Sequence, residues 1–395
     1  MYSLKIFTLL CVFMCLWMPQ GQAQTADVIE NYRKEMPKLE PLSAEAFEEA
    51  SQSYTYKPED NEKMHFQMRY PKDWKAKATL EDSQLAFSQG VISEIVTFVS
   101  PARVIMPRSQ IVVEFSELTH EISAEHWVLK YMLARGLASK GLNVIDGRRA
   151  EFFYIDIEAD LTFGVRALVQ INGNKLFLTK YKMPVEAWKD ESPIQKASLD
   201  SFEILHPTDE AIESLLEYQF LDLALVRYPR SWRHKATPIR SIDRMEVGLF
   251  RVNTDPETEK RVLEGRIDMN MINFSVVESL EKEHTALQQK LLGNKLLLGD
   301  VLSVPDHITP KAFVEESDFF EDFSVESYKA QTNEGRVLGY EFWVSKVLVG
   351  DYYYFFTMLT PSRVDNFFGW SRNVETYKLV LKSFDPNLDN ALYDE

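Results

Sequence analysis

The order of apolar and polar positions along the chain predicts the same succession of elements twice. A strand is predicted to end at a Tyr-Pro turn over His65–Tyr70 and again over Phe220–Tyr228, because the residue before a proline prefers an extended backbone. Proline has no N–H to donate and suits the second position of a turn, so the tryptophan that follows is expected to be a buried plug. A further strand and a helix of about five turns follow in each half, and in the second half His284 lies among leucines at helical spacing.

Hairpins are predicted to close both halves. Glycine is expected to end each helix, at Gly141 and Gly299. Long strands then flank Asn172-Gly173 and Gly350-Asp351, and an Asn-Gly pair between apolar strands is a strong hairpin signal. The run Tyr352–Phe356 is aromatic at every position, so both faces of that strand are expected to be covered. The predicted fold class is α+β, with two tandem domains that are each a mainly antiparallel sheet with helices on both faces.

The two halves also share residues. RYPKDWKAKAT (69–79) and RYPRSWRHKAT (227–237) are identical at seven of eleven positions and lie 158 residues apart. The same offset aligns Glu125-His126 with Glu283-His284, and it rises to 182 near the ends of the two halves. A period this long indicates tandem domains rather than a solenoid of short repeats.

The first residues predict export. Lys5 precedes an apolar run, Ile6–Met18, and Gly21-Gln22-Ala23 supplies small residues before a cleavage point, which is the pattern of a secretory signal peptide. An uncleaved anchor is the alternative, although the run is short for a transmembrane helix. Both cysteines lie in this segment, so the mature chain is expected to contain no disulfide. The predicted location is the periplasm or the secreted fraction, with no transmembrane segment after signal cleavage.

Charge and motif content argue against several function classes. The formal net charge is −16, and so acidic a surface repels nucleic acid, which binds through Lys and Arg contacts to phosphate. The seven histidines are dispersed, and no HExxH, P-loop, GxSxG or GxGxxG motif occurs. The repeated Glu-His pairs are adjacent residues, which do not face each other on a helix, so a buried histidine is the better interpretation. No catalytic residue, metal ligand or cofactor is predicted.

One stretch mixes acids with aromatic rings. Residues 300–323, DVLSVPDHITPKAFVEESDFFEDF, hold seven acids against one lysine, and the extra residues of the second half fall here. Acids with interleaved rings are suited to a basic or amphipathic segment of a protein partner; the alternative is that the phenylalanines fold back onto their own domain. The candidate partner-binding residues are Phe313, Glu315, Glu316, Asp318, Phe319, Phe320, Glu321, Asp322 and Phe323.

Together these motifs resemble a known family. A strand ending in Tyr-Pro-x-x-Trp, a central helix, a long aromatic hairpin and a closing helix that ends at Ser-Phe are similar to the PsbP-like α/β/α sandwich superfamily. That group includes the photosystem extrinsic protein, the Ran-binding Mog protein and DcrB-like periplasmic proteins. The resemblance covers residues 54–205 and 218–386, and it implies two tandem copies of that fold with a non-catalytic binding role. The chain departs from the DcrB-like members because it lacks a well-placed cysteine for lipid attachment.

The sequence therefore predicts an organisation and a role. The function expected is that of an exported, non-catalytic binding or scaffolding protein of the bacterial cell envelope that acts through protein–protein contacts. A carrier or chaperone for an apolar ligand or hydrophobic peptide, held under the aromatic hairpin, is the alternative, and a hydrolytic enzyme is the third hypothesis. The predicted segments are a signal peptide (1–23), a polar segment (24–53) with a short helix from Ser43, a first PsbP-like domain (54–205), a connector helix (206–217) and a second PsbP-like domain (218–395) with the acidic insertion near 300–323.

Overall fold

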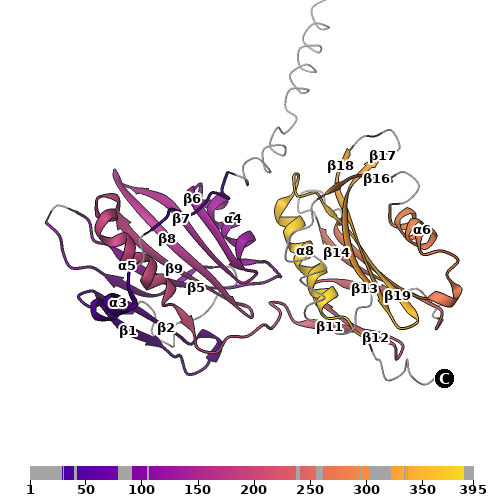
Figure 1. Cartoon of the computed structure of the whole chain (residues 1–395), viewed down its shortest axis with the longest axis horizontal. Helices are drawn as coiled ribbons and strands as arrows, with labels where there is room; N and C mark the ends of the chain where they lie inside the picture. The colour runs from indigo at the N-terminus through magenta and orange to yellow at the C-terminus, as the bar shows by residue number, and fades with distance from the viewer. Residues whose placement is uncertain are drawn as a thin grey trace, which may run out of the picture.

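Two units lie side by side, each built on a seven-stranded sheet (Figure 1). Neighbouring strands are antiparallel throughout both units. The computed structural model describes residues 29, 31–39, 42–78, 91–104, 106–236, 241–254, 261–292, 296–302, 322–332, 335 and 337–386.

In the first unit the strand order is β3-β4-β5-β9-β8-β7-β6, beside a small sheet in the order β1-β2-β10. The helices are α3 (Ala44–Ala50), α4 (Ala124–Arg135) and α5 (Trp188–Asp200). The strands are β1 (Ser51–Tyr56), β2 (Phe66–Pro71), β3 (Lys75–Ala78), β4 (Ser93–Val99), β5 (Gln110–Glu117), β6 (Ala138–Asp146), β7 (Arg149–Glu158), β8 (Leu161–Asn172), β9 (Lys175–Pro184) and β10 (Glu203–Ile204).

The second unit repeats this order, with a large sheet β13-β14-β15-β19-β18-β17-β16 and a small sheet β11-β12-β20. The repeat in the sequence is therefore a repeat of topology. The helices are α6 (Leu280–Leu292) and α8 (Phe367–Lys382). The strands are β11 (Leu215–Phe220), β12 (Ala224–Pro229), β13 (Arg233–Ala236), β14 (Arg244–Thr254), β15 (Arg261–Asn273), β16 (Leu296–Leu302), β17 (Asp322–Thr332), β18 (Val337–Val349), β19 (Tyr352–Pro361) and β20 (Asp385–Pro386).

The repeated Tyr-Pro-x-x-Trp motif ends a strand with a turn. The amide of Trp74 donates to the carbonyl of Pro71 at 3.1 Å, and that of Trp232 donates to Pro229 at 2.9 Å. Proline is thus the last residue of the strand and holds the first position of the turn, not the second. The two indoles are only 7% and 1% exposed, which confirms that each tryptophan is a buried plug.

The long hairpin strands pack through both of their faces. In the first unit α4 contacts β6, β7 and β8, whereas α5 contacts β2, β8 and β9. In the second unit Phe355 packs with Leu287 of α6 in one apolar cluster, and the adjacent Phe356 belongs to the cluster that contains Tyr377 of α8. Successive side chains of a strand point to opposite faces of the sheet, so Phe355 and Phe356 of β19 pack against different helices.

The glycines expected to end the helices lie elsewhere. Helix α4 ends earlier, where Gly136 adopts a left-handed conformation (φ 63°) and donates its amide to the carbonyls of Leu133 and Met132. Gly141 lies within β6, where a Cβ atom would come within 2.7 Å of the Cα of Met36. Gly299 similarly lies within β16, after α6 has ended. Gly141 is needed for close approach of the N-terminal segment and not for a helix cap.

That N-terminal segment packs on the edge of the first sheet. The amide of Leu142 donates to the carbonyl of Lys34 at 2.8 Å, and the Ser139 hydroxyl donates to the carbonyl of Tyr32 at 2.9 Å. Because β6 is an edge strand, these contacts protect backbone groups that would otherwise be available for pairing. The short helix expected from Ser43 is present as α3, capped by the Ser43 hydroxyl.

The predicted connector helix over 206–217 is wrong. These residues contain no helix, and β11 begins at Leu215. The connector's backbone groups bond to side chains of the first unit instead, as described below, so they need no helical partners.

Most of the predicted acidic site lies outside the described residues. The candidate residues outside the described part of the chain are Phe313, Glu315, Glu316, Asp318, Phe319, Phe320 and Glu321. The predicted signal segment 1–23 also lies outside it. Asp322 and Phe323 open β17 and pair opposite Leu348 and Val347 of β18. β16 and β17 correspond to β6 and β7, whose connection is only Gly147-Arg148, so the insertion lengthens this one hairpin.

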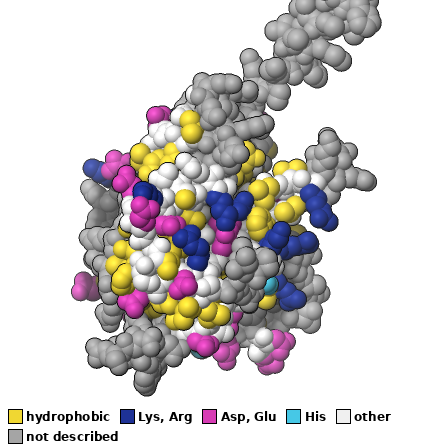
Figure 2. All heavy atoms as spheres, turned by 90° about the vertical axis from the view of Figure 1, so that its right-hand side faces the viewer, with side chains coloured by type: hydrophobic (Ala, Val, Ile, Leu, Met, Phe, Trp, Pro, Cys, Tyr) yellow, Lys and Arg dark blue, Asp and Glu magenta, His cyan; other side chains and the backbone are white. Residues whose placement is uncertain are grey.

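The outward face of the second unit mixes both signs of charge with hydrophobic side chains (Figure 2). Among the residues that the structure describes, no helix has the length and apolar character needed to cross a membrane.

Candidate functional site

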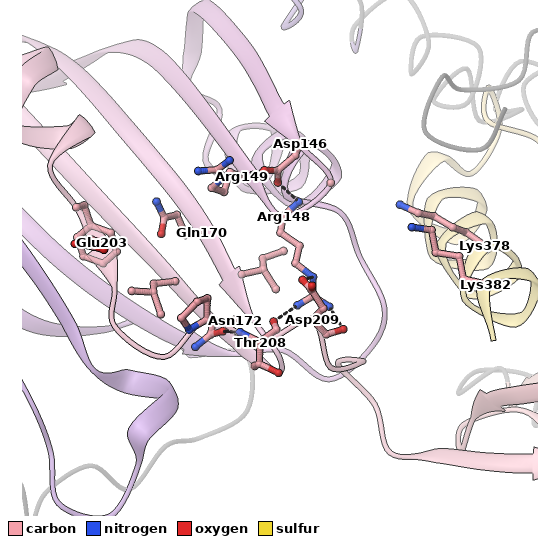
Figure 3. A pocket seen from close by; sticks show the side chains of 15 residues that line it. Asp146, Arg148, Arg149, Gln170, Asn172, Glu203, Thr208, Asp209, Lys378 and Lys382 are labelled. Carbon is pink, nitrogen blue, oxygen red and sulfur yellow. Dashed lines mark hydrogen bonds and ion pairs between the residues drawn. The ribbon is translucent and has the colours of Figure 1, made fainter. Parts of the chain in front are cut away.

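Two adjoining cavities lie between the units, one of about 670 Å³ and one of about 560 Å³. They share Gly147 and Arg148 from the β6–β7 turn, Asp209 from the connector, and Lys378 and Lys382 from α8. Figure 3 shows the two lysine side chains extending from α8 on the side of the cavity opposite Arg148. We call the two cavities together the inter-unit cleft.

The connector forms one wall of the cleft and is fixed by three side chains of the first unit. The Asn172 side chain accepts from the amide of Thr208 at 2.7 Å and donates to the carbonyl of His206 at 3.0 Å. Arg148 donates to three successive connector carbonyls, at 2.7–3.3 Å. Glu121 accepts from the amide of Glu213 at 3.0 Å. These bonds replace the intrahelical bonds that a helix would have formed, and they attach the connector to the first unit.

Direct contact between the units is made by α4 and α8. The ring of His126 lies edge-on to Phe367 and Trp370, with centroids 5.2 and 5.6 Å away, and is 2% exposed. Its Nδ1 lies 4.0 Å from a carboxylate oxygen of Glu375. The interpretation of His126 as a buried histidine is therefore confirmed, and its neighbours come from the other unit.

The second Glu-His pair does not occupy the equivalent place. His284 stacks on Phe355 of its own sheet at 6.4 Å and bonds to Gln288 at 2.9 Å. Burial lowers the pKa of His284. The two pairs align in sequence, but the structure places only His126 between the units.

Charged side chains of both signs line the inter-unit cleft, and several of the acidic ones have partners within the protein, whereas the Asp209 side chain is fully exposed. Asp146 accepts from the Arg148 amide at 2.8 Å and from Arg149 Nε at 2.7 Å. Glu203 accepts from Gln67. Lys378 Nζ lies 3.7 Å from Glu375, which is longer than a hydrogen bond. The two cavities together are lined by five basic and five acidic side chains, so the lining is polar and mixed in charge.

Two titrating groups at this boundary have shifted pKa values. Burial raises the pKa of Glu121, although the amides of Glu213 and Ile212 donate to it. Burial and the nearby charges of Lys130 and Arg251 lower the pKa of His120 to about 4. Arg251 belongs to β14 of the second unit, so a charge in one unit lowers the pKa of a histidine in the other.

A third cavity, of about 490 Å³, lies over the β5–β9–β8–β7 part of the first sheet. Its charges are paired with one another: Lys180 bonds Glu114 at 2.6 Å, and Lys182 bonds Asp156 at 3.0 Å. The aromatic run of β19 lines none of these three cavities, since Phe355 and Phe356 are buried in the core.

Buried charges elsewhere have structural partners. In the first unit Arg166 bonds Glu151 at 2.6 Å and Gln195 at 3.3 Å, with Arg166 and Glu151 1% and 5% exposed. In the second unit Glu341, 2% exposed, accepts from Arg363 and from the indole of Trp370. Among the described residues, no group of three or more His, Cys, Asp or Glu side chains could hold a metal ion.

Sequence reasoning missed the cleft because its residues come from distant parts of the chain. One clue was present in the repeat. At the offset of 182, Lys196 and Asp200 on α5 correspond to Lys378 and Lys382 on α8, so an oppositely charged pair in the first unit is a pair of lysines in the second.

No protein-family model matches the chain, and no curated protein matches it. Among solved structures it is similar to cyanobacterial PsbP (CyanoP) from Synechocystis sp. PCC 6803, at 16% identity over 39% of this chain and 92% of that one, with a TM-score of 0.29. It is also similar to PA94, a protein of unknown function from Pseudomonas aeruginosa, at 11% identity over 40% and 99% of the two chains, with a TM-score of 0.27. A third is the type VI secretion immunity protein TplEi from Pseudomonas aeruginosa, at 10% identity over 86% and 97%, with a TM-score of 0.19.

Proposed function

We propose that the chain is an exported, non-catalytic binding or scaffolding protein of the bacterial cell envelope, acting through protein–protein contacts at the inter-unit cleft. The observation that carries this proposal is the fixed relation of the two units. The connector is bonded to the first unit by Asn172, Arg148 and Glu121, and α4 packs on α8 through His126. A cleft held on both sides needs little reordering on binding, which favours affinity.

In this proposal each unit is a PsbP-like sandwich with helices on both faces of its sheet. The repeated Tyr-Pro-x-x-Trp turns and the matching strand orders support two copies of one design. Export rests on the charged start, apolar run and small residues of segment 1–23. An intact mass that begins after Ala23, measured on protein from the periplasmic fraction, is the expected sign of cleavage; a full-length mass in the membrane fraction would mean an anchor.

The acidic insertion remains a second candidate surface for a basic or amphipathic partner, because it concentrates acids and phenylalanines in residues 300–323. The carrier hypothesis has less support, since Phe355 and Phe356 pack in the core and line none of the three cavities.

The test is affinity capture from envelope extract with a variant that fills the cleft. A side chain added at Gly147 would meet Lys378 Nζ at 3.5 Å and no closer atom, so Gly147→Trp is expected to place an indole in the cleft without disturbing the fold. The exposed Asn143 lies on the same hairpin outside the lining, and Asn143→Trp is the matched control. A second comparison replaces residues 300–323 with a short Gly/Ser loop.

We expect an identified partner to be captured by the wild type and the control but lost by Gly147→Trp. All proteins must first melt with the same cooperativity. A partner retained by Gly147→Trp and lost only with the loop replacement would move the binding site from the cleft to the insertion. If no version captures a partner, the scaffolding role fails.

A further inference from the structure

The first unit has a cavity of its own, on the face of the sheet that α4 only partly covers. Helix α4 contacts β6, β7 and β8, and the third cavity lies beside it, lined mainly by residues of β5, β7, β8 and β9. The cavity measures about 490 Å³, which falls within the range of small-molecule pockets, about 300–1,000 Å³. It shares no lining residue with the inter-unit cleft.

The strand registers match this part of the first sheet to the second, residue by residue. Both β9 and β19 end in a proline, and each pairs with the long strand before it. Two residues before that proline, Lys182 lies opposite Val165 in the first unit, and Leu359 lies opposite Phe342 in the second. The next strand places a tyrosine opposite this position in both units.

The second unit fills these positions, whereas the first leaves space beside them. Phe342 is fully buried in an apolar cluster with Leu359 and Tyr328. At the matching positions of the first unit, the smaller Val165 and the charged Lys182 line the cavity. Because the same sheet design packs with apolar residues here, the fold does not require the cavity or its charges, which makes the cavity a candidate binding site.

The walls of the cavity are ion pairs, so they carry little net charge. Three basic and four acidic side chains line it. Lys180 bonds Glu114 at 2.6 Å, and Lys182 bonds Asp156 at 3.0 Å. The side chains of Lys180, Glu114 and Lys182 are 16–17% exposed, so part of each is accessible. A cation or an anion would find no excess of opposite charge in this cavity.

These pairs leave hydrogen-bonding capacity unused. An ammonium group has three N–H donors, and Lys180 directs one of them to Glu114. The Oε2 atom of Glu114 is buried and accepts no hydrogen bond from the residues that the structure describes. A buried acceptor without a partner costs free energy, and a ligand that draws this carboxylate toward itself would recover part of that cost. A hydroxyl group both donates and accepts, so it can bond to a lysine and a neighbouring carboxylate together.

The floor of the cavity is aromatic and apolar. Tyr131, Tyr154 and Val165 are 6%, 4% and 1% exposed, and all three belong to the lining. Burial raises the pKa of Tyr154, so its hydroxyl stays protonated. A sugar ring presents C–H groups on its faces and hydroxyls around its edge, which matches an apolar floor between polar walls. An inorganic ion would contact only the walls.

We infer that this cavity binds a neutral oligosaccharide, with its hydroxyls on the Lys180–Glu114 and Lys182–Asp156 pairs and the C–H face of a ring against Tyr154. This inference goes beyond the proposed function, because it adds a small-molecule site within one unit to a protein–protein contact between the units. Either one can fail without the other.

The test is isothermal titration calorimetry of the full-length mature protein with three neutral trisaccharides, maltotriose, cellotriose and triacetylchitotriose. The variant Val165→Phe fills the cavity with the residue that the second unit has at the matching position. Val144→Phe makes the same change at a valine of β6 that is 46% exposed and lines none of the three cavities. Glu114→Gln is a second variant that keeps the shape of the wall and removes its charge.

We expect saturable binding of at least one trisaccharide with a Kd below about 1 mM. The affinity should change little with added salt, since a neutral ligand is not subject to charge screening. Val165→Phe and Glu114→Gln should each weaken binding about tenfold or more, because hydrogen bonds to charged groups are the stronger ones. Val144→Phe should bind like the wild type.

Three results would overturn the inference. The first is a Kd above about 1 mM for all three trisaccharides. The second is wild-type affinity in a Val165→Phe protein that melts as cooperatively as the wild type; if that variant does not fold, unchanged affinity in Glu114→Gln decides in the same way. The third is displacement of the trisaccharide by free lysine or inorganic phosphate at equal concentration, which would make the site one for ionic ligands.

Discussion

The backbone amide of Arg227 donates to the hydroxyl of Ser383 at 2.8 Å. The first unit makes the same bond at the same length, from Arg69 to Ser201. Each hydroxyl also donates to the last turn of the closing helix, at Val380 or Ser198. The strand before the Tyr-Pro turn is thus tied to the end of the closing helix, which explains why both motifs occur in both halves.

Removing these hydroxyls should destabilise each unit. We expect Ser201→Ala and Ser383→Ala each to lower the free energy of unfolding by about 1–2 kcal/mol, because each leaves a backbone amide without its partner. Urea denaturation monitored by tryptophan fluorescence measures the change. Ser275→Ala, at an exposed serine, is the control, and an equal loss there would show that the bridge contributes nothing.

Gly265 should tolerate no side chain, because the plug of the second unit packs against it. An added Cβ would lie 2.8 Å from the Trp232 ring and 2.7 Å from the Asn373 amide. Overpacking a core costs about 1–3 kcal/mol, and we expect Gly265→Ala to fall in that range by chemical denaturation. Gly147→Ala, which meets only a lysine amine at 3.5 Å, should be nearly neutral.

Removing one partner of the buried pair Arg166–Glu151 should destabilise the fold strongly, whereas replacing both partners with apolar residues should destabilise it little. We expect Arg166→Leu alone to cost about 3–5 kcal/mol, because it removes the hydrogen-bonded partner of a buried carboxylate and leaves only Lys196, 3.8 Å away. The double variant with Glu151→Val should recover much of that loss, since strand register places Val325 at this position in the second unit. A double-mutant cycle of unfolding free energies measures the interaction energy between the two side chains. Strictly additive losses would show that they do not interact.

His120 should make stability depend on pH. Its pKa is about 4 in the folded chain against an ordinary 6.5, so between these values the unfolded chain binds a proton that the folded chain does not. Stability should therefore fall as the pH decreases from 6.5 to 4, by about 2 kcal/mol for this group.

His120→Gln should flatten that dependence, and the comparison must be made as a difference from wild type at pH 7 and pH 4. Burial raises the pKa values of Glu121 and Asp268. The folded state then holds their protons more tightly, so these two groups act in the opposite direction. An unchanged pH profile in the variant would show that His120 does not carry the effect.

The side chain of Asn172 should be needed to keep the connector packed against the first unit. It accepts from Thr208 and donates to His206 and Lys63. We expect Asn172→Ala to cost about 2–3 kcal/mol and to speed amide hydrogen exchange in residues 206–213. Asn143→Ala, at an exposed site of the neighbouring hairpin, should change neither; slow exchange retained in Asn172→Ala would mean that Arg148 and Glu121 suffice.

Local chemistry predicted much of the fold. The hairpin predicted at Asn172-Gly173 forms one residue further along, because Asn172 pairs with Lys175 and the turn residues are Gly173, with a positive φ of 58°, and Asn174. The tryptophan plugs follow from the turn that precedes them. The connector could not be predicted, because the donors and acceptors that replace its helical bonds are Asn172, Arg148 and Glu121, which lie far away along the chain. The inter-unit cleft was hidden for the same reason, since its basic residues converge only once the two units have packed.

The units meet through unlike faces: α4 of the first contacts α8 of the second, and α8 is the counterpart of α5, not of α4. No twofold axis relates two copies joined in this way, so the contact is heterologous, with different surfaces on its two sides. The outer helices of the two units present exposed polar residues, Lys189 and Asp190 on α5 and Lys282 and Gln289 on α6. The two ends of the molecule are therefore different surfaces, one formed by α5 and the other by α6. A partner that binds one of these ends would give the molecule a defined orientation.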